Sequence, residues 1–172
     1  MTKKESTKKG LGYWLRQAVQ MMVILTVVSV AVDWYRTQDI ATDTAPSLVA
    51  NTVAGLPVDL IEQSHKEPVI VYFWATWCPA CKFVSPSVSW LADHYSVVAV
   101  SSASGEEQRV AQFLQSKDYQ FENVNDPNNI FMRKWGVQVT PTIFIVNQGK
   151  IESITTGVTT PIGIIARVWF SK

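Results

Sequence analysis

The chain has 172 residues, of which 47% are hydrophobic and 17% are charged, and its formal net charge is +1. This composition supports one packed domain with a modest appendage and excludes wholesale disorder. The near-neutral charge, without a basic stripe interleaved with aromatic residues, excludes a nucleic-acid-binding protein. The chain's two cysteines are too few for a disulfide-rich scaffold or a four-thiolate zinc site. His65 and His94 lie at no recognisable ligand spacing from them, so no zinc site is expected.

The N-terminal segment differs in composition from the rest of the chain. Residues 1–10 are rich in lysine, and no charged residue occurs from Gln17 to Val32. With the apolar residues before Arg16, this stretch provides the roughly 20 residues that a bilayer requires. Trp14 and Trp34 would lie about 30 Å apart along a helix, as interfacial aromatic residues do. We therefore expect a cytoplasmic tail (1–10), a single transmembrane anchor (11–35), and everything beyond it outside the cytoplasm.

A cleaved signal peptide is the competing interpretation of this segment. Ser29-Val30-Ala31 provides the small residues that a signal peptidase recognises. The length of the segment and its two aromatic ends favour the uncleaved anchor, and a buried helix of a soluble protein would normally carry a polar stripe. Residues 36–47 are small and polar, with Pro46 among them, and are predicted to form a linker.

Residues 48–172 show strand and helix patterns in alternation. Such an order predicts an α/β domain with a mixed sheet covered by helices on both sides. In chain order, we expect a hairpin in 51–60, a buried central strand in 68–75, a helix in 82–95 interrupted by Pro86, a buried strand in 97–103, an amphipathic helix in 105–118, a short or edge strand in 121–126, a short helix in 128–136 closed by Gly136, a hairpin in 142–157 and a closing helix in 160–170.

Both cysteines lie where the central strand should give way to a helix, in the stretch Cys78-Pro79-Ala80-Cys81. Proline suits the first turn of a helix, so the helix is expected to begin at this pair. Cys78 would then lie near a helix N-terminus, where backbone N–H groups and the helix dipole favour a thiolate. Residues three apart on a helix are close enough to form a disulfide after a small adjustment.

A redox dithiol is the favoured interpretation of this pair. A permanent structural disulfide is a poor alternative, because a bridge across so short a ring constrains little of the unfolded chain. Binding of Cu(I) by the two thiolates also stays open, which would make the chain a copper-handling protein. That alternative would need a third ligand or a second protein.

The residues from Val69 to Tyr95, with Trp77 before the first cysteine and Pro86 after the second, resemble the active-site strand and helix of the thioredoxin superfamily. The stretch 135–151 is similar to the second signature of that superfamily. The segment 105–125 and the opening hairpin resemble its TlpA-like branch of membrane-anchored, extracytoplasmic members. The suppressor-of-copper-sensitivity D group is the most similar within that branch, by the short N-terminal tail, residues 32–36 and residues 72–81.

This resemblance implies a thioredoxin-like fold and a thiol–disulfide oxidoreductase in the bacterial inner membrane that faces the periplasm. It makes Cys78–Cys81 a redox-active disulfide and Thr140-Pro141 the cis-proline loop that faces it. The residues expected to contact substrate are Trp77, Pro79, Thr140 and Pro141. The expected partners are substrate proteins, held by a mixed disulfide, and a membrane electron donor, with no cofactor.

Two residues depart from the pattern of the relatives. Thioredoxin carries a buried acid in the strand before the motif, where this chain has Tyr72. Haem-pathway reductases usually carry a glutamate three residues after the second cysteine, where this chain has Val84. Because both acids assist proton transfer at the buried cysteine, their absence argues against a dedicated haem-pathway role. Pro79 and Ala80 offer no side-chain hydrogen bond to Cys78, so extreme stabilisation of its thiolate is not expected.

Overall fold

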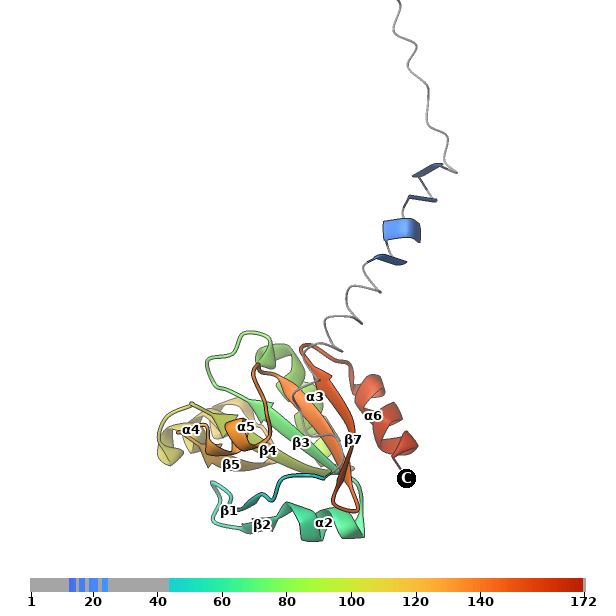
Figure 1. Ribbon diagram of the computed structural model, residues 1–172. Coiled ribbons are helices and arrows are strands. Elements are labelled where there is room, and N and C mark those ends of the chain that lie inside the picture. The colour runs from blue at the N-terminus through green and yellow to red at the C-terminus, as the bar shows by residue number, and fades with distance from the viewer. Residues whose placement is uncertain (1–12, 15, 18, 22, 25–43, 172) are drawn as a thin grey trace, which may run out of the picture. The chain divides into compact units, whose positions relative to one another are not determined.

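The computed structural model describes residues 13, 14, 16, 17, 19–21, 23, 24 and 44–171 (Figure 1). The chain divides into two compact units, residues 1–38 and 39–172. In the first unit, the described residues between Tyr13 and Ile24 are helical. No helix among the described residues is long and apolar enough to cross a membrane. The predicted tail (1–10), much of the anchor (11–35) and most of the linker (36–47) lie outside the described residues, so these assignments stay predictions.

The second unit is built on a five-stranded mixed sheet in the order β5-β4-β3-β6-β7. Strand β3 lies at its centre, parallel to β4 and antiparallel to β6, while β5 and β7 form the two edges. The predicted mixed sheet is therefore confirmed. The strands are β3 (Val69–Trp74), β4 (Ser96–Ser102), β5 (Glu122–Asp126), β6 (Thr142–Asn147) and β7 (Lys150–Thr156).

Helices and a small hairpin surround this sheet. The hairpin is an antiparallel pair, and together with α2 it lies along one margin of the domain in Figure 1. Every helix predicted after residue 47 is present, and α2 is an additional one. These elements are β1 (Val49–Asn51), β2 (Pro57–Asp59), α2 (Leu60–Lys66), α3 (Cys81–Ala92), α4 (Glu107–Lys117), α5 (Ile130–Lys134) and α6 (Pro161–Phe170).

Strand β3 separates two hydrophobic cores, because successive side chains of a strand point to opposite faces of the sheet. Tyr72 and Trp74 lie in the core that α3 and α6 cover, whereas Val71 and Phe73 lie in the core that the hairpin, α2 and α5 cover. All six residues of β3 are buried. The continuous apolar run in the sequence is thus explained by burial on both faces.

The packed domain begins earlier than the predicted start at residue 48. Ala45 is buried, and its amide donates a hydrogen bond to the carbonyl of Gly149 in the turn between β6 and β7. Lys134 of α5 donates hydrogen bonds to the carbonyl and hydroxyl oxygens of Ser47. The last residues of the predicted linker are therefore held against the domain by contacts that their small, polar composition does not reveal.

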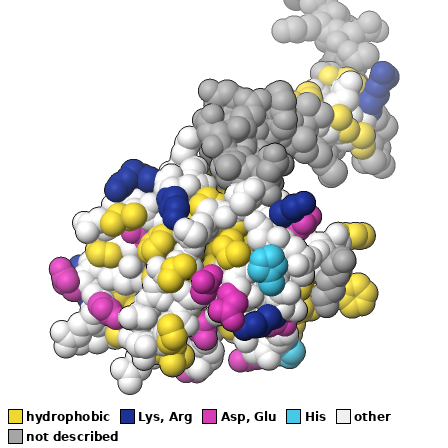
Figure 2. Space-filling model, turned by 60° about the horizontal axis from the view of Figure 1, so that its bottom comes forward, with side chains coloured by type: hydrophobic (Ala, Val, Ile, Leu, Met, Phe, Trp, Pro, Cys, Tyr) yellow, Lys and Arg dark blue, Asp and Glu magenta, His cyan; other side chains and the backbone are white. Residues whose placement is uncertain are grey.

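The surface near the hairpin and α2 carries charges of both signs. Figure 2 shows acidic and basic side chains scattered among hydrophobic ones on this face. This pattern agrees with the near-zero net charge of the chain.

Candidate active site

The two cysteines lie in the turn that joins β3 to α3. The amide of Lys82 donates to the carbonyl of Pro79 at 3.2 Å, and regular helix begins at Cys81. The expectation that the helix begins at the cysteine pair is therefore confirmed, and Pro79 and Ala80 form a turn ahead of the regular helix. Pro86 lies inside α3, as predicted.

Cys78 and Cys81 are joined by a disulfide, with their Cα atoms 5.3 Å apart. Only 3% of Cys78 and 2% of Cys81 is exposed, so a partner must approach closely to reach either sulfur. The amide of Cys81 donates to Cys78 Sγ over 3.1 Å. After reduction, the same N–H would favour a thiolate on Cys78, since a hydrogen bond to the charged form stabilises that form.

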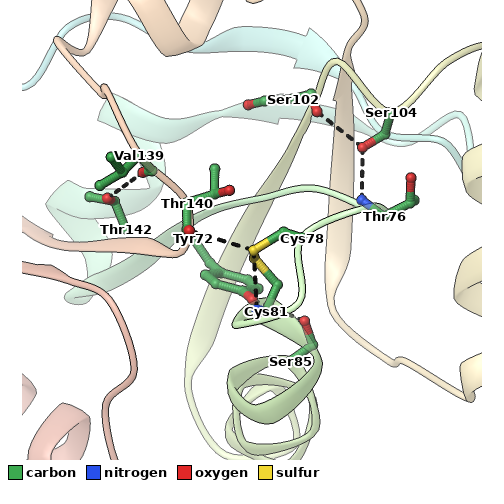
Figure 3. Close-up of a disulfide and its surroundings, with 10 residues drawn as sticks. All are labelled: Tyr72, Thr76, Cys78, Cys81, Ser85, Ser102, Ser104, Val139, Thr140 and Thr142. Carbon is green, nitrogen blue, oxygen red and sulfur yellow. Dashed lines mark hydrogen bonds between the residues drawn. A yellow bond between two sulfur atoms is a disulfide. The ribbon is translucent and has the colours of Figure 1, made fainter.

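The segment before β6 faces the disulfide. The peptide bond between Thr140 and Pro141 is cis, as the resemblance implied. The carbonyl oxygen of Thr140 lies 3.5 Å from Cys78 Sγ (Figure 3), close enough to accept a hydrogen bond from a reduced thiol. The hydroxyl of Thr142 donates to the carbonyl of Val139 at 2.8 Å, which holds the segment in place. The structure therefore brings Thr140 and Cys78 together, although they are far apart in the sequence.

Exposed apolar side chains neighbour the disulfide and its facing segment along the chain. Trp77, 62% exposed, directly precedes Cys78, and its indole N–H donates to the carbonyl of Ala103 at 2.9 Å. Phe83 lies two residues after Cys81, and Val139 directly precedes Thr140. Val158 follows Gly157, whose amide donates to the carbonyl of Pro141. We refer to Trp77, Phe83, Val139 and Val158 as the apolar rim; all four are exposed.

The positions where the relatives carry acids are buried and uncharged. Val84 is fully buried, as is Tyr72, whose hydroxyl lies 2.9 Å from that of Ser85 (Figure 3). Burial raises the pKa of Tyr72 well above its ordinary range, and the hydrogen bond with Ser85 opposes only part of that rise. A neutral pair of hydroxyl groups therefore lies beside the disulfide, in place of a carboxyl group.

Trp74 has a structural role, as its position in a buried strand predicted. It is 1% exposed, and its indole N–H donates to Asn123 Oδ1 at 2.9 Å. The other side of Asn123 donates to the hydroxyl of Ser101 at 3.0 Å. This buried polar chain ties β3 to β4 and β5 and keeps the strand ahead of the cysteines in position.

The polar residues that support the site were not predicted from the sequence. The hydroxyl of Ser104 accepts from the amide of Thr76 at 3.0 Å and donates to the carbonyl of Ser102, which fixes the loop before Cys78 (Figure 3). Ser85 could have been found, because it lies four residues after Cys81 and so on the same face of α3. Ser104 gave no local signal, since it meets Thr76 only in the folded chain.

Metal binding has little support in the part of the chain that the structure describes. There, no group of three or more histidine, cysteine or acidic side chains could hold a metal ion. The two cysteines of the chain are bonded to each other. The arrangement of a buried disulfide, a facing backbone carbonyl and an apolar rim is suited to thiol–disulfide exchange.

Comparisons with known proteins agree with this geometry. Residues 41–154 match the sequence profile of the AhpC/TSA family. A thioredoxin-like protein of Haemophilus influenzae is 31% identical over 92% of this chain and 95% of its own length. The thiol–disulfide oxidoreductase ResA of Oceanobacillus iheyensis is 29% identical over 89% of this chain and 85% of its own. The crystal structure of StoA from Bacillus subtilis matches 72% of this chain and 98% of its own, with a TM-score of 0.63 and 24% identity.

Proposed function

Because the chain belongs to the AhpC/TSA family and is a thioredoxin-like thiol–disulfide oxidoreductase, we propose that it reduces or exchanges disulfides of partner proteins from the periplasmic side of the bacterial inner membrane. The observation that carries the proposal is the Cys78–Cys81 disulfide. Its Cys78 Sγ atom lies 3.5 Å from the carbonyl oxygen of Thr140. A disulfide at a helix start, opposite a backbone segment, can exchange with a bound thiol or disulfide.

In the reducing direction, the Cys78 thiolate attacks one sulfur of the partner's disulfide. A bond forms between the two sulfurs, and the other partner sulfur leaves as a thiolate that takes a proton. Cys81 then loses its proton and attacks Cys78 Sγ, which releases the second partner thiol and restores the Cys78–Cys81 disulfide. Two electrons have moved from the enzyme to the partner, Cys81 has released one proton, solvent has supplied the other, and no cofactor takes part.

A protein partner fits the surroundings of the disulfide better than a small molecule does. The cavity that contacts both cysteines has a volume of about 10 Å³, which leaves room for about one water molecule. The exposed apolar rim instead offers a surface on which a partner chain can bury apolar side chains. We propose that Trp77, Pro79, Thr140 and Pro141 contact the partner and that the Thr140 backbone pairs with it.

The proposed location rests on the N-terminal sequence. An uncleaved anchor with the N-terminus in the cytoplasm typically has three features that occur here. They are a lysine-rich tail, an uncharged stretch (Gln17 to Val32) and aromatic residues at the ends of that stretch. The resemblance to the TlpA-like branch, and within it to the suppressor-of-copper-sensitivity D group, supports the same placement. Carbonate extraction of host membranes tests the anchor: retention in the membrane supports it, and release as a soluble protein contradicts it.

The proposed direction of electron flow is from a membrane reductase through this protein to its partners. It rests on family analogy, since neither a fold nor a motif fixes direction. The uncharged Pro79-Ala80 pair supports it, because it provides no side-chain stabilisation of the kind that makes a dithiol strongly oxidising. A reduction potential near about −120 mV, typical of a strong oxidant, would contradict this direction.

Trapping of mixed disulfides tests the exchange reaction. In Cys81→Ala, partners should accumulate as mixed disulfides on Cys78, visible as bands that disappear on reduction, and their identities would give substrate and direction. The double variant Cys78→Ala/Cys81→Ala is the control and should trap nothing. The proposal fails if Cys81→Ala traps no partner. If the chain instead bound Cu(I) stoichiometrically and showed no disulfide activity, that result would support the copper-handling alternative.

A further inference from the structure

A small cavity is lined by the end of β3 and the turn that carries the disulfide, the first residues of α3, and residues of and after α4. Cys78, Cys81, Ser85 and Tyr119 are among the residues that line it, and its volume of about 10 Å³ suits a single water molecule. Cys78, Cys81 and the hydroxyl-bearing Ser85 and Tyr119 are the lining residues available as polar partners for such a water.

Ser85 and Tyr119 line this cavity, and the hydroxyl of Tyr72 contacts Ser85 beside it. Ser85 Oγ of α3 lies 2.9 Å from the hydroxyl of Tyr72, which is buried in β3. Tyr119, in the segment between α4 and β5, is only partly buried. Burial raises the pKa of Tyr119, and a hydrogen-bonding interaction with Ser85 opposes that rise. Ser85 therefore contacts the buried hydroxyl of Tyr72 and shares the cavity with the partly exposed Tyr119.

The described residues around this cavity include no carboxyl group. The titratable groups that line it, or contact Ser85 beside it, are Cys78, Cys81, Lys82, Tyr72 and Tyr119. Lys82 is exposed. Cys81 must nevertheless lose a proton before it attacks the mixed disulfide, and it must regain one when the dithiol is restored. A buried thiol with no carboxyl group beside it, and with an exposed Lys82 as the charged side chain of the lining, needs another route for that proton.

We propose that Ser85 is a positioning residue that holds a water molecule against Cys81 and, with Tyr119, passes the proton of Cys81 to solvent. This inference rests on the proposed function. As the Cys81 sulfur attacks Cys78 Sγ, its proton moves to the water, and the water passes a proton along the hydroxyl groups to solvent. The bond between Cys78 and the partner sulfur breaks, and its electron pair leaves with the partner thiolate, which is protonated from solvent. Tyr72 holds the Ser85 hydroxyl in orientation and stays neutral.

The two chemical steps can be separated with dithiobis-nitrobenzoate, a disulfide that releases a coloured thiolate. When the reduced full chain is mixed with this reagent, attack by Cys78 releases the first thiolate, and attack by Cys81 on the mixed disulfide releases the second. We expect Ser85→Ala to slow the second phase about tenfold at neutral pH while the first phase is unchanged. The pH profile and the solvent deuterium isotope effect of the second phase should also change, and Ser85→Thr should restore both.

A matched control lies one turn further along α3. Ser89 is buried and accepts a hydrogen bond from the amide of Gln120, but it does not line the cavity. Ser89→Ala should leave both phases unchanged, and Tyr72→Phe should slow only the second, by less than Ser85→Ala. The relay is wrong if the second phase of Ser85→Ala keeps its rate, pH profile and isotope effect, or if Ser89→Ala changes them equally. If wild type itself shows no second phase, the proposed function fails instead.

Discussion

The hydroxyl groups of Tyr72 and Ser85 lie 2.9 Å apart beside the active-site disulfide. Tyr72 occupies the position in β3 where thioredoxin carries a buried acid, and Ser85 lies on α3 next to the buried Val84. The pair is neutral at all ordinary pH values, since burial raises the pKa of Tyr72 above its usual range. The domain therefore avoids burying a charge beneath its cysteines, and proton movement at Cys81 depends on hydroxyl groups and water.

Tyr72 should make the stability of the domain depend on alkaline pH. In the folded state Tyr72 keeps its proton, whereas an unfolded tyrosine loses it near its ordinary pKa of about 10. Above that pH the unfolded chain binds fewer protons, so the free energy of unfolding should fall as pH rises. Tyr119, whose pKa burial also raises, contributes in the same direction. Urea denaturation of the oxidised protein between neutral pH and about pH 11 measures this slope.

Tyr72→Phe isolates the contribution of Tyr72. At neutral pH the variant should lose about 1–2 kcal/mol of unfolding free energy, because the buried Ser85 hydroxyl loses its hydrogen bond with the Tyr72 hydroxyl. Above about pH 10 its free energy of unfolding should fall less steeply than that of wild type. Of the two tyrosines with a raised pKa, only Tyr119 then contributes to the fall. An equally steep fall in the variant would show that Tyr72 does not retain its proton.

The two tryptophans near the cysteines should separate stability from function. Trp74→Ala removes a fully buried side chain and its hydrogen bond to Asn123, and should lower the unfolding free energy by about 3–5 kcal/mol. Trp77→Ala removes an exposed side chain and should cost less than about 1 kcal/mol. Urea denaturation followed by circular dichroism compares the two.

Trp77→Ala should nevertheless slow the reduction of a protein disulfide, because it removes part of the apolar rim. Its reaction with a small disulfide reagent should be unchanged, since that reagent needs only the sulfur atoms. If both substrates are slowed to the same extent, Trp77 acts on the cysteines themselves and not on partner binding.

Asp126 should stabilise the segment after β5. Its carboxylate is buried and accepts hydrogen bonds from the amides of Ile130 at 2.6 Å and Met132 at 2.9 Å, at the start of α5. Asp126→Ala leaves both amides unpaired and should cost about 2 kcal/mol, whereas Asp126→Asn should cost less because one acceptor remains. Asp93→Ala, at an exposed position after α3, is the control and should be close to neutral in urea denaturation. A neutral Asp126→Ala would contradict this capping role.

Much of the fold could be predicted because burial leaves a local pattern in the sequence. The apolar run of β3 indicates a strand covered on both faces, and the glycine-bearing turn before Lys150 indicates the hairpin of β6 and β7. Helix α2 was missed because it is short and mostly polar. Its signals are Asp59, which accepts from the amide of Glu62 at 3.1 Å, and the ion pair of Glu62 with Lys66.

The candidate site was predictable only where its residues follow one another in the chain. The spacing of Cys78 and Cys81 predicts a redox pair, and the resemblance to the thioredoxin superfamily predicts that Pro141 faces it. The contact of Ser85 with Tyr72 depends on how α3 packs on β3, and Tyr119 reaches the same place from beyond α4. Sequence alone shows the missing acids at positions 72 and 84, but not which groups take their place.

The stability of the oxidised and reduced forms should reveal the direction of electron flow. The disulfide closes only a short ring from Cys78 to Cys81, so it should stabilise the oxidised domain by about 2 kcal/mol, at the low end of what disulfides contribute through the entropy of the unfolded chain. In a strong oxidant the reduced form is the stabilised one, because its thiolate is strongly favoured. Here the hydrogen bond to Cys78 Sγ comes from a neutral backbone amide, that of Cys81, and not from a charged group. We therefore expect the oxidised protein to unfold at a higher urea concentration than the reduced protein, as fits a reductant. Unfolding of both forms in matched urea series, with thiols blocked after unfolding to confirm the redox state, measures the difference; a more stable reduced form would reverse the proposed direction.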